Sequence, residues 1–219
     1  GVAGVSGNGQ RELFETIVGV RELDSGCILL DQADITRRDP AWIADEGISH
    51  IPEDRLKEGL VPDFTIAENL ILGLHRNRFF WNGLYPLTSA VKEFSRRCIE
   101  EFSIVATSQD QKTRNLSGGN LQRVILAREL STDPKVLIAN QPTRGLDVGA
   151  IEYVHQRLIE QRGAGVGVLL FSEDLDEILN LSDRVIVLFN GKIVKSLPAD
   201  KAVREEIGML MAGMGEESE

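Results

Sequence analysis

The sequence predicts an α/β protein with a mostly parallel sheet flanked by helices, and two observations support that prediction. Short apolar segments alternate with longer segments in which apolar residues recur at helical spacing. One of the short segments, residues 135–139, is continuously apolar after Lys135. Such a segment is typical of a strand in the middle of a parallel sheet, where both faces are covered.

The same patterns give the individual elements. Helices are expected to begin within residues 12–18 and to span residues 148–161. Strands are expected at residues 27–30, 48–51, 135–139, 166–171, 184–189 and 192–194. The last two strands are separated by Asn190-Gly191, which suits a tight two-residue turn and predicts a hairpin.

The middle of the chain, residues 62–133, is expected to form a helical subdomain inserted into the sheet domain. It contains a polar loop with aromatic residues, among them Phe79, Phe80, Trp81 and Tyr85. The acidic tail, residues 215–219, is expected to be disordered.

Length and composition limit the classes of function. The chain has 219 residues and a net charge of −10, which disfavours binding to nucleic acid through phosphate contacts. No apolar run is long enough to span a bilayer, so any membrane role is expected to be peripheral, through a partner. Cys27 and Cys98 are expected to be small buried residues in a reducing compartment.

The start of the chain is glycine-rich. A phosphate-binding loop normally follows a strand, whereas here we expect no strand before the loop that opens at Gly4. We therefore interpret the chain as a piece of a longer protein.

The strongest motif is Leu116-Ser117-Gly118-Gly119-Asn120, which opens onto an amphipathic helix. Free backbone N–H groups and the helix dipole at such a start favour an anion, and the Ser117 hydroxyl adds a donor. The alternative is an ordinary helix N-cap formed by Ser117.

Two further motifs are weaker when each is taken alone. The loop Gly4-Val5-Ser6-Gly7-Asn8-Gly9-Gln10-Arg11 has glycines that let a backbone fold around a phosphate, but it could be a common glycine-rich turn. The buried segment at 136–139 ends in Asn140-Gln141-Pro142-Thr143, which could be a strand followed by a simple turn.

Taken together, the order and spacing of these motifs resemble the ABC ATPase family over essentially the whole chain. Gly145-Leu146-Asp147 and Phe171-Ser172-Glu173 complete that order. Three short segments, at residues 51–55 (IPEDR), 67–70 (AENL) and 141–150 (QPTRGLDVGA), resemble the sequences of importers of simple sugars and nucleosides. In those importers the ATP-binding subunit carries two cassettes in one polypeptide. The resemblance implies a P-loop NTPase-type fold for residues 1–219, a single nucleotide-binding domain that looks like the second cassette.

The resemblance also assigns roles by position. The nucleotide-binding positions are Gly4, Ser6, Gly7, Asn8, Gly9, Gln10, Arg11, Glu53 and Asn140. The signature that acts in trans is Leu116, Ser117, Gly118, Gly119 and Asn120, and the dimer loop is Gly145, Leu146 and Asp147.

This sequence departs from the family pattern in the phosphate loop. The pattern G-x-x-x-x-G-K-[ST] has Gln10 in place of the lysine and Arg11 in place of the metal-binding hydroxyl. Gln10 is neutral, and Arg11 has no lone pair with which to ligate Mg²⁺. Arg11 could replace the lysine's charge, but the sequence does not give its direction.

The departures continue at the other catalytic positions. Asn140-Gln141 stands where the family has Asp-Glu, and neither amide can act as a base at neutral pH. Glu173 replaces a histidine near the γ-phosphate, and Glu53 replaces a glutamine that senses the metal. ATP is therefore expected to bind weakly or to remain unhydrolysed at this site, Mg²⁺ is poorly supported, and the isolated domain is expected to have little or no ATPase activity. The alternative is that Asp174 or Glu53 serves as base.

Cassettes of this family pair head to tail, so the resemblance implies that the intact signature completes the ATP site of the first cassette. It also implies transmembrane permease subunits as partners, a solute-binding protein acting indirectly, and a place at the cytoplasmic face of the plasma membrane. Two other functions stay open: a self-sufficient ATPase with unusual catalytic residues, and a non-transport ABC scaffold or regulator. The second is disfavoured by the net charge and by the 117 − 53 = 64 positions between Glu53 and Ser117, too few for a long coiled-coil insertion.

Overall fold

A computed structural model describes residues 1–74, 80–82 and 85–214 of the chain. The acidic tail at 215–219 and Phe79 of the aromatic loop lie outside the described residues, so the expectations about them are not addressed.

The chain forms two compact units. The first unit comprises Gly1–His50, Lys135–Gln141 and the residues from Val154 onward, and the second comprises Ile51–Pro134 and Pro142–Tyr153. The predicted helical subdomain, residues 62–133, falls entirely within the second unit, and its role as a signature subdomain stays a prediction.

The main sheet lies in the first unit, apart from Ile51 at the end of its last strand, and has six strands in the order β10-β9-β1-β8-β7-β4. Their bounds are β1 Val2–Ala3, β4 Ile48–Ile51, β7 Val136–Asn140, β8 Gly167–Ser172, β9 Arg184–Phe189 and β10 Lys192–Pro198. β1 pairs in parallel with both β8 and β9, and β7 pairs in parallel with β8, whereas β10 is antiparallel to β9. The prediction of a mostly parallel sheet flanked by helices is confirmed.

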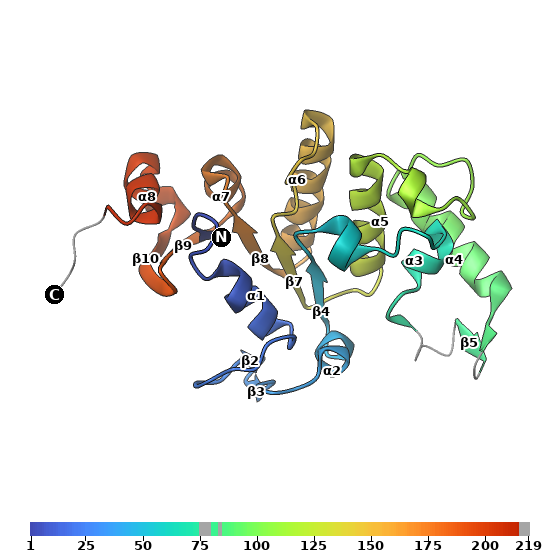
Figure 1. Ribbon diagram of the computed structural model, residues 1–219, viewed down its shortest axis with the longest axis horizontal. Helices are drawn as coiled ribbons and strands as arrows, with labels where there is room; N and C mark the ends of the chain where they lie inside the picture. Colours follow the sequence, from blue (N-terminus) through green and yellow to red (C-terminus); the bar gives the residue numbers. More distant parts are fainter. Residues whose placement is uncertain (75–79, 83–84, 215–219) are drawn as a thin grey trace. The chain divides into compact units, whose positions relative to one another are not determined.

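The described residues also form two small ribbons and several helices (Figure 1). The ribbons are β2 Leu29–Leu30 with β3 Ala33–Asp34, and β5 Trp81–Asn82 with β6 Tyr85–Pro86. The α-helices are α1 Gln10–Ile17, α2 Pro40–Asp45, α3 Ile66–Leu70, α4 Thr88–Glu101, α5 Gly118–Leu130, α6 Val148–Gly163, α7 Leu175–Leu181 and α8 Arg204–Met211. Shorter helical turns are η1 Arg55–Gly59, η3 Thr113–Asn115 and η4 Ala199–Lys201.

One face of the sheet packs against α1. Phe14 of α1 meets Phe171 of β8 edge to face, with ring centroids 6.3 Å apart, and Val2 and Ile138 belong to the same buried cluster. Successive residues of a strand point to opposite faces, so the neighbours of Val2 face the other side. There α7 contacts β1 and β8, and its Ile178 is completely buried.

The hairpin predicted at the end of the chain is confirmed. Asn190 and Gly191 both have positive φ angles, 48° and 73°, as a two-residue turn of this kind requires. β10 continues to Pro198, beyond the expected end at residue 194. Figure 1 shows α8 beside this hairpin, and α8 contacts β9.

The expectation that no strand precedes the glycine-rich loop is wrong. Val2 and Ala3 form β1 in the middle of the sheet, and their exposed fractions are 1% and 0%. Two residues suffice because β8 and β9 both offer a ladder of hydrogen-bonding groups, one on each side.

The two cysteines behave differently from each other. Cys98 in α4 is buried, as expected, and burial raises the pKa of its thiol. Cys27 is exposed, so the expectation for it is wrong. The strand predicted at 27–30 shrinks to the two residues of β2, because the chain reverses at once through Asp31 and Gln32, whose φ angles are 48° and 67°.

We predict that replacing Ile138 by Ala lowers the free energy of unfolding by about 2–5 kcal/mol, because it leaves a cavity in a fully buried strand. Ile193→Ala on β10 is the matched control, since Ile193 is 61% exposed, and it should stay within about 0.5 kcal/mol of the unsubstituted chain. Urea unfolding followed by circular dichroism measures both. Equal losses would show that β7 is not part of the core.

Candidate functional site

The candidate phosphate site lies at one edge of the sheet in the first unit. Parallel strands carry their carboxyl ends at the same edge, and β1, β8 and β7 are parallel neighbours. The glycine-rich loop follows β1, Asn140 and Gln141 stand at the end of β7, and Glu173 follows β8. The sheet therefore gathers at this edge the residues of the first unit that the sequence singled out.

The glycine-rich loop has the backbone of a phosphate cradle. Gly7 and Gly9 have φ angles of 88° and 102°, which residues with a Cβ rarely adopt. Nothing lies within 4 Å of the place where a Cβ of Gly7 would stand. The loop ends at α1, whose N-cap Gly9 gives no side-chain hydrogen bond, so the first N–H groups of the helix have no cap. Backbone N–H groups and open space thus remain available to an anion.

The Asn8 side chain stabilises the fold of the loop rather than offering groups to a ligand. Its side chain is 5% exposed; its Oδ1 accepts from the N–H of Asn190 at 3.0 Å, and its Nδ2 donates to the carbonyl of Met211 at 3.4 Å. Its own carbonyl accepts from the N–H of Gly191 at 3.0 Å. Asn8 therefore fastens the loop to the turn between β9 and β10, a role that the sequence analysis did not foresee.

Gln10 and Arg11 do not replace the missing lysine. Gln10 is 7% exposed, and its amide fills the space in front of Gly4, where a Cβ would come within 2.4 Å of its Nε2. Arg11 lies along α1 and its Nε donates to Glu15 Oε1 at 2.8 Å. This hydrogen bond holds the pKa of Glu15 below its usual value. The direction of Arg11, which the sequence left open, is thus toward Glu15.

The end of β7 carries two amides in different settings. Asn140 is 4% exposed, within the sheet. Gln141 has a φ of 50°, unusual for a residue with a side chain, and its Oε1 accepts from the N–H of Glu173 at 3.4 Å. Gln141 therefore ties the end of β7 to the loop after β8 by a neutral hydrogen bond.

The two residues considered as alternative bases are both engaged. Asp174 caps α7, where its Oδ1 accepts from the N–H groups of Asp176 at 2.9 Å and of Glu177 at 3.3 Å. Glu53, in the second unit, forms an ion pair with Arg144. Each carboxylate has a partner that competes with a proton-transfer role.

The signature motif begins α5 in the second unit. Ser117 is the N-cap, and its exposed hydroxyl accepts from Asn120 Nδ2 at 3.0 Å. The N-cap alternative is therefore confirmed as geometry. It leaves the anion role open, because Ser117 and Gly118 are both exposed at the start of a 13-residue helix.

The predicted dimer loop lies against the signature within the second unit. A Cβ at position 119 would stand only 3.2 Å from the Cβ of Ala150. Because glycine has no Cβ, the start of α6 can pack close to the start of α5. Asp147 caps α6 by accepting from the N–H of Ala150 at 3.0 Å. Arg55 Nη2 donates to the carbonyl of Arg144 at 2.8 Å, next to Gly145.

Arg144 is the residue whose role the sequence analysis missed. It lies within the QPTRGLDVGA motif, but nothing in its spacing points to Glu53, 144 − 53 = 91 positions earlier. The two motif segments, 51–55 and 141–150, are joined through this ion pair and through Arg55.

The residues present do not fit a magnesium ion. The usual ligands are an oxygen after the phosphate-loop lysine and a carboxylate at the end of the strand, and here these are Arg11 and Asn140. Among the residues that the structure describes, no group of three or more His, Cys, Asp or Glu side chains could hold a metal. The phosphate cradle itself does fit an anion, as its open backbone shows.

The described part of the chain contains no helix with the length and hydrophobicity required to cross a membrane.

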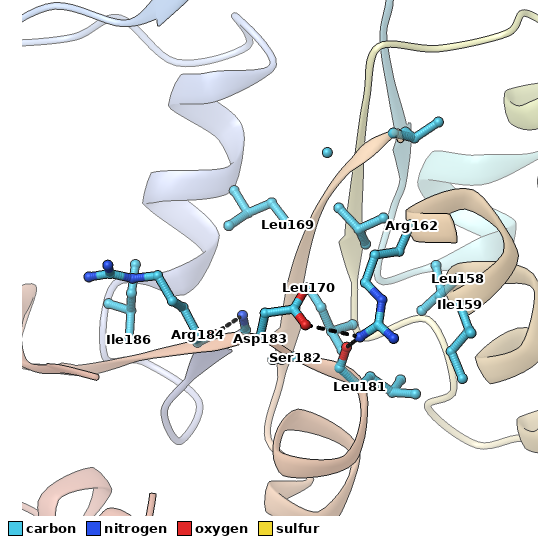
Figure 2. Close-up of a pocket in the computed structure, with 14 residues that line it drawn as sticks. Leu158, Ile159, Arg162, Leu169, Leu170, Leu181, Ser182, Asp183, Arg184 and Ile186 are labelled. Carbon is cyan, nitrogen blue, oxygen red and sulfur yellow. Dashed lines mark hydrogen bonds and ion pairs between the residues drawn. The ribbon is translucent and has the colours of Figure 1, made fainter. Parts of the chain in front are cut away.

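A cavity of about 370 Å³ in the first unit is a separate feature (Figure 2). Its wall includes Leu169 and Leu170 of β8 and Leu158 of α6, and Arg162 beside it pairs with Asp183 at 3.4 Å. It borders the early residues of β8, whereas Glu173 follows that strand's carboxyl end. The cavity is therefore not part of the phosphate cradle.

Comparison with known proteins gives one family. The model of the ABC transporter family matches residues 1–144. The guanosine import ATP-binding protein NupO of Bacillus subtilis (strain 168) is 47% identical over 214 residues, which cover 97% of this chain and 42% of that protein. The glucose import ATP-binding protein TsgD13 of Haloferax volcanii is 43% identical over 218 residues, covering 99% of this chain and 40% of the relative. The chain spans about two fifths of the length of these relatives.

A solved structure shares the fold. A nucleotide-free ATP-binding cassette from an ABC transporter superposes with a TM-score of 0.76 at 25% identity, covering 98% of this chain and 87% of that chain.

We predict that Asn8→Ala destabilises the chain by about 1–3 kcal/mol, because it removes the buried bonds to Asn190 and Met211. The control is Ser6→Ala in the same loop, at an exposed position, which should change stability by no more than about 0.5 kcal/mol. Thermal melting measures both. Unchanged melting of Asn8→Ala, together with lost ATP binding, would instead make Asn8 a ligand.

Proposed function

The chain belongs to the ABC transporter family, and on that premise we propose that it is the second, degenerate cassette of an ATP-binding subunit that drives import of simple sugars or nucleosides. The import functions printed for the two relatives support the solute class. Their length, more than twice that of this chain, leaves room for a first cassette in the same polypeptide.

We propose that this cassette contributes to catalysis through its signature rather than through its phosphate loop. The observation that carries the proposal is the exposed Ser117 at the start of α5, in an intact motif. The N–H groups and dipole of this helix start would stabilise the γ-phosphate of ATP held by the first cassette. Gln10, Arg11, Asn140 and Gln141 cannot do the equivalent work in this chain's own site.

The partners follow from the same proposal. The second unit exposes apolar side chains, including Val61 at 37% and Phe64 at 41%. We assign this surface, together with Leu56, to contact with transmembrane permease subunits. The protein would then lie at the cytoplasmic face of the plasma membrane, peripheral through the permease. A solute-binding protein would act indirectly, and the permease and that protein would choose the solute.

A self-sufficient ATPase is the second candidate. It needs a base near the γ-phosphate, and the two acidic candidates are held elsewhere, Asp174 as a helix cap and Glu53 with Arg144. Glu173 is exposed and adds negative charge beside the loop. No observation favours a nucleic-acid partner for a chain with a net charge of −10.

For the isolated chain, we predict weak ATP binding that changes less than about twofold when Mg²⁺ is added, and no measurable Mg²⁺-dependent hydrolysis. Losing one base or one electrostatic group commonly costs about two to four orders of magnitude in rate, and this site lacks several. Calorimetry with and without Mg²⁺, and a phosphate-release assay on protein free of contaminating ATPases, test this. A Mg²⁺-dependent rate that Gln141→Ala abolishes would support the self-sufficient ATPase instead.

For the full two-cassette subunit with its permease, we predict that Ser117→Arg nearly abolishes ATPase activity and transport. The substitution puts a bulky cation at the helix start that should face the other cassette's γ-phosphate. The matched comparison restores Gln10→Lys together with Gln141→Glu, which should change activity much less because Arg11, Asn140 and Glu173 remain.

Thermal melts of each variant control for misfolding. The assignment of roles would be reversed if Ser117→Arg left transport intact while folded variants at Gln10 destroyed it.

A further inference from the structure

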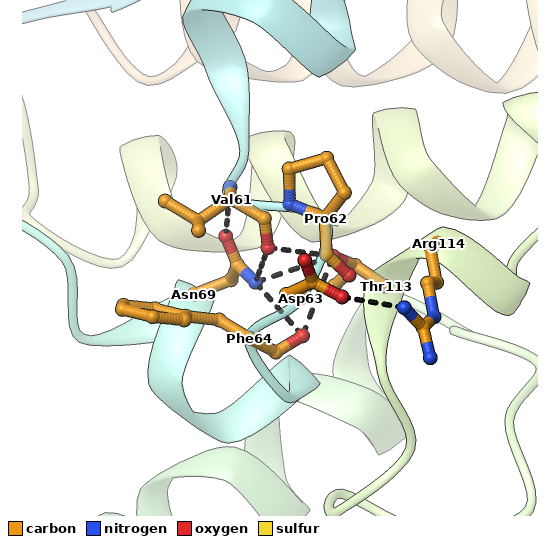
Figure 3. A network of polar contacts seen from close by, with 7 residues as sticks. All are labelled: Val61, Pro62, Asp63, Phe64, Asn69, Thr113 and Arg114. Carbon is orange, nitrogen blue, oxygen red and sulfur yellow. Dashed lines mark hydrogen bonds and ion pairs between the residues drawn. The ribbon is translucent and has the colours of Figure 1, made fainter.

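A buried polar network lies inside the second unit, centred on Asn69 of α3 and Thr113 of η3 (Figure 3). Both residues have an exposed fraction of 0%, although both carry polar side chains. Asn69 Nδ2 donates to Thr113 Oγ1 at 3.3 Å, which joins two segments that are 44 positions apart in the sequence.

Asn69 holds the segment that follows η1. Its Oδ1 accepts from the N–H of Val61 at 2.8 Å, and its Nδ2 donates to the carbonyls of Val61 and Thr65, each at 3.0 Å. The side chain thus closes on both polar groups of Val61, so the backbone there has little freedom to move alone.

Thr113 holds the same segment from the other side. Its hydroxyl donates to the carbonyl of Val61 at 3.1 Å, and its N–H donates to the carbonyl of Phe64 at 3.0 Å. The next residue repeats the pattern, since the N–H of Arg114 donates to the carbonyl of Pro62 at 3.0 Å. Residues 61–64 and 113–114 therefore form one hydrogen-bonded body.

The two ends of this body lead to the two surfaces that matter for the proposed function. Val61 and Phe64 present exposed apolar side chains, at 37% and 41%. On the other side, η3 ends at Asn115, and Leu116 leads directly into Ser117. The network thus stands between the proposed permease contact and the signature serine.

We propose that Asn69 and Thr113 are positioning residues that transmit a displacement at Val61 and Phe64 to the segment carrying Ser117. The inference rests on the proposed function and adds its route of regulation. The two side chains at the centre of the network are completely buried, so water has little access to replace the bond between them, and a movement of one segment takes the other with it. The α3 helix adds stiffness, because Thr65 and Glu68 form a capping box at its start.

The test uses the full two-cassette subunit, with ATPase rates measured alone and after reconstitution with its permease. Thr113→Val keeps the shape of the side chain and removes the hydroxyl. We expect the stimulation by permease to fall at least about tenfold, since the bond to the carbonyl of Val61 is lost, while the rate without permease stays within about twofold. Thr113→Ser restores the hydroxyl and should restore stimulation.

The matched control is Arg114→Gln in the same helical turn. It removes only the exposed ion pair of Arg114 with Asp63, at 2.6 Å, and should leave both rates unchanged. Ser117→Arg is measured in parallel and should abolish both rates.

These variants separate the two proposals. If Ser117→Arg is inactive but Thr113→Val keeps full stimulation, the network proposal fails alone. A folded Thr113→Val that loses both rates equally also overturns it, because the network would then only hold the signature. If Ser117→Arg stays active, the proposed function fails and the network falls with it.

A second measurement covers the case in which Thr113→Val does not fold. Hydrogen exchange of the unsubstituted subunit, with and without permease, should show peptides covering residues 60–66 and 112–119 changing together. A peptide covering α4, residues 88–101, should not follow them. A change limited to residues 60–66 would contradict transmission.

Discussion

The position of β1 between β8 and β9 is the constraint on which the first unit depends. Val2 and Ala3 are buried on both faces and pair in parallel on both sides, so the loop that follows must emerge at the carboxyl edge of the sheet. The same register places the end of β8, and through it the end of β7, at that edge. The candidate phosphate loop owes its place at that edge to backbone pairing, whatever side chains the loop carries.

That independence explains how the loop can keep its shape without the usual charged groups. Gly7 and Gly9 supply the left-handed backbone, and Asn8 fastens the loop to the β9–β10 turn. None of these features needs a lysine. Gln10 turns inward and packs against Gly4, whereas Arg11 stays at the surface and turns along α1 to Glu15. The backbone conformation of the loop therefore does not depend on the charged groups of the family pattern.

The sequence predicted the parts of this structure that rest on local patterns and motif order. The continuous apolar segment gave β7, and Asn190-Gly191 gave the hairpin, because both signals lie within a few residues. It failed where the outcome depends on distant partners. β1 is a strand only because β8 and β9 flank it, and Arg144 finds Glu53 across 91 positions (144 − 53). Arg11 and its partner Glu15 are only four positions apart. Their spacing alone does not decide whether the guanidinium pairs with Glu15 or points toward solvent or a ligand.

The buried amide of Asn140 at the end of β7 explains why the departures from the family pattern at positions 10, 11 and 140 belong together. Asn140 is 4% exposed, and a carboxylate at that depth would need a cation beside it to offset the cost of its desolvation. The lysine and the metal-binding hydroxyl that would supply or hold such a cation are Gln10 and Arg11 here, and Arg11 already pairs with Glu15. A neutral side chain is therefore the stable choice at position 140 once those groups are absent. Restoring a single charge in this site would likewise leave that charge unpaired, so the residues at positions 10, 11 and 140 form one electrostatic set.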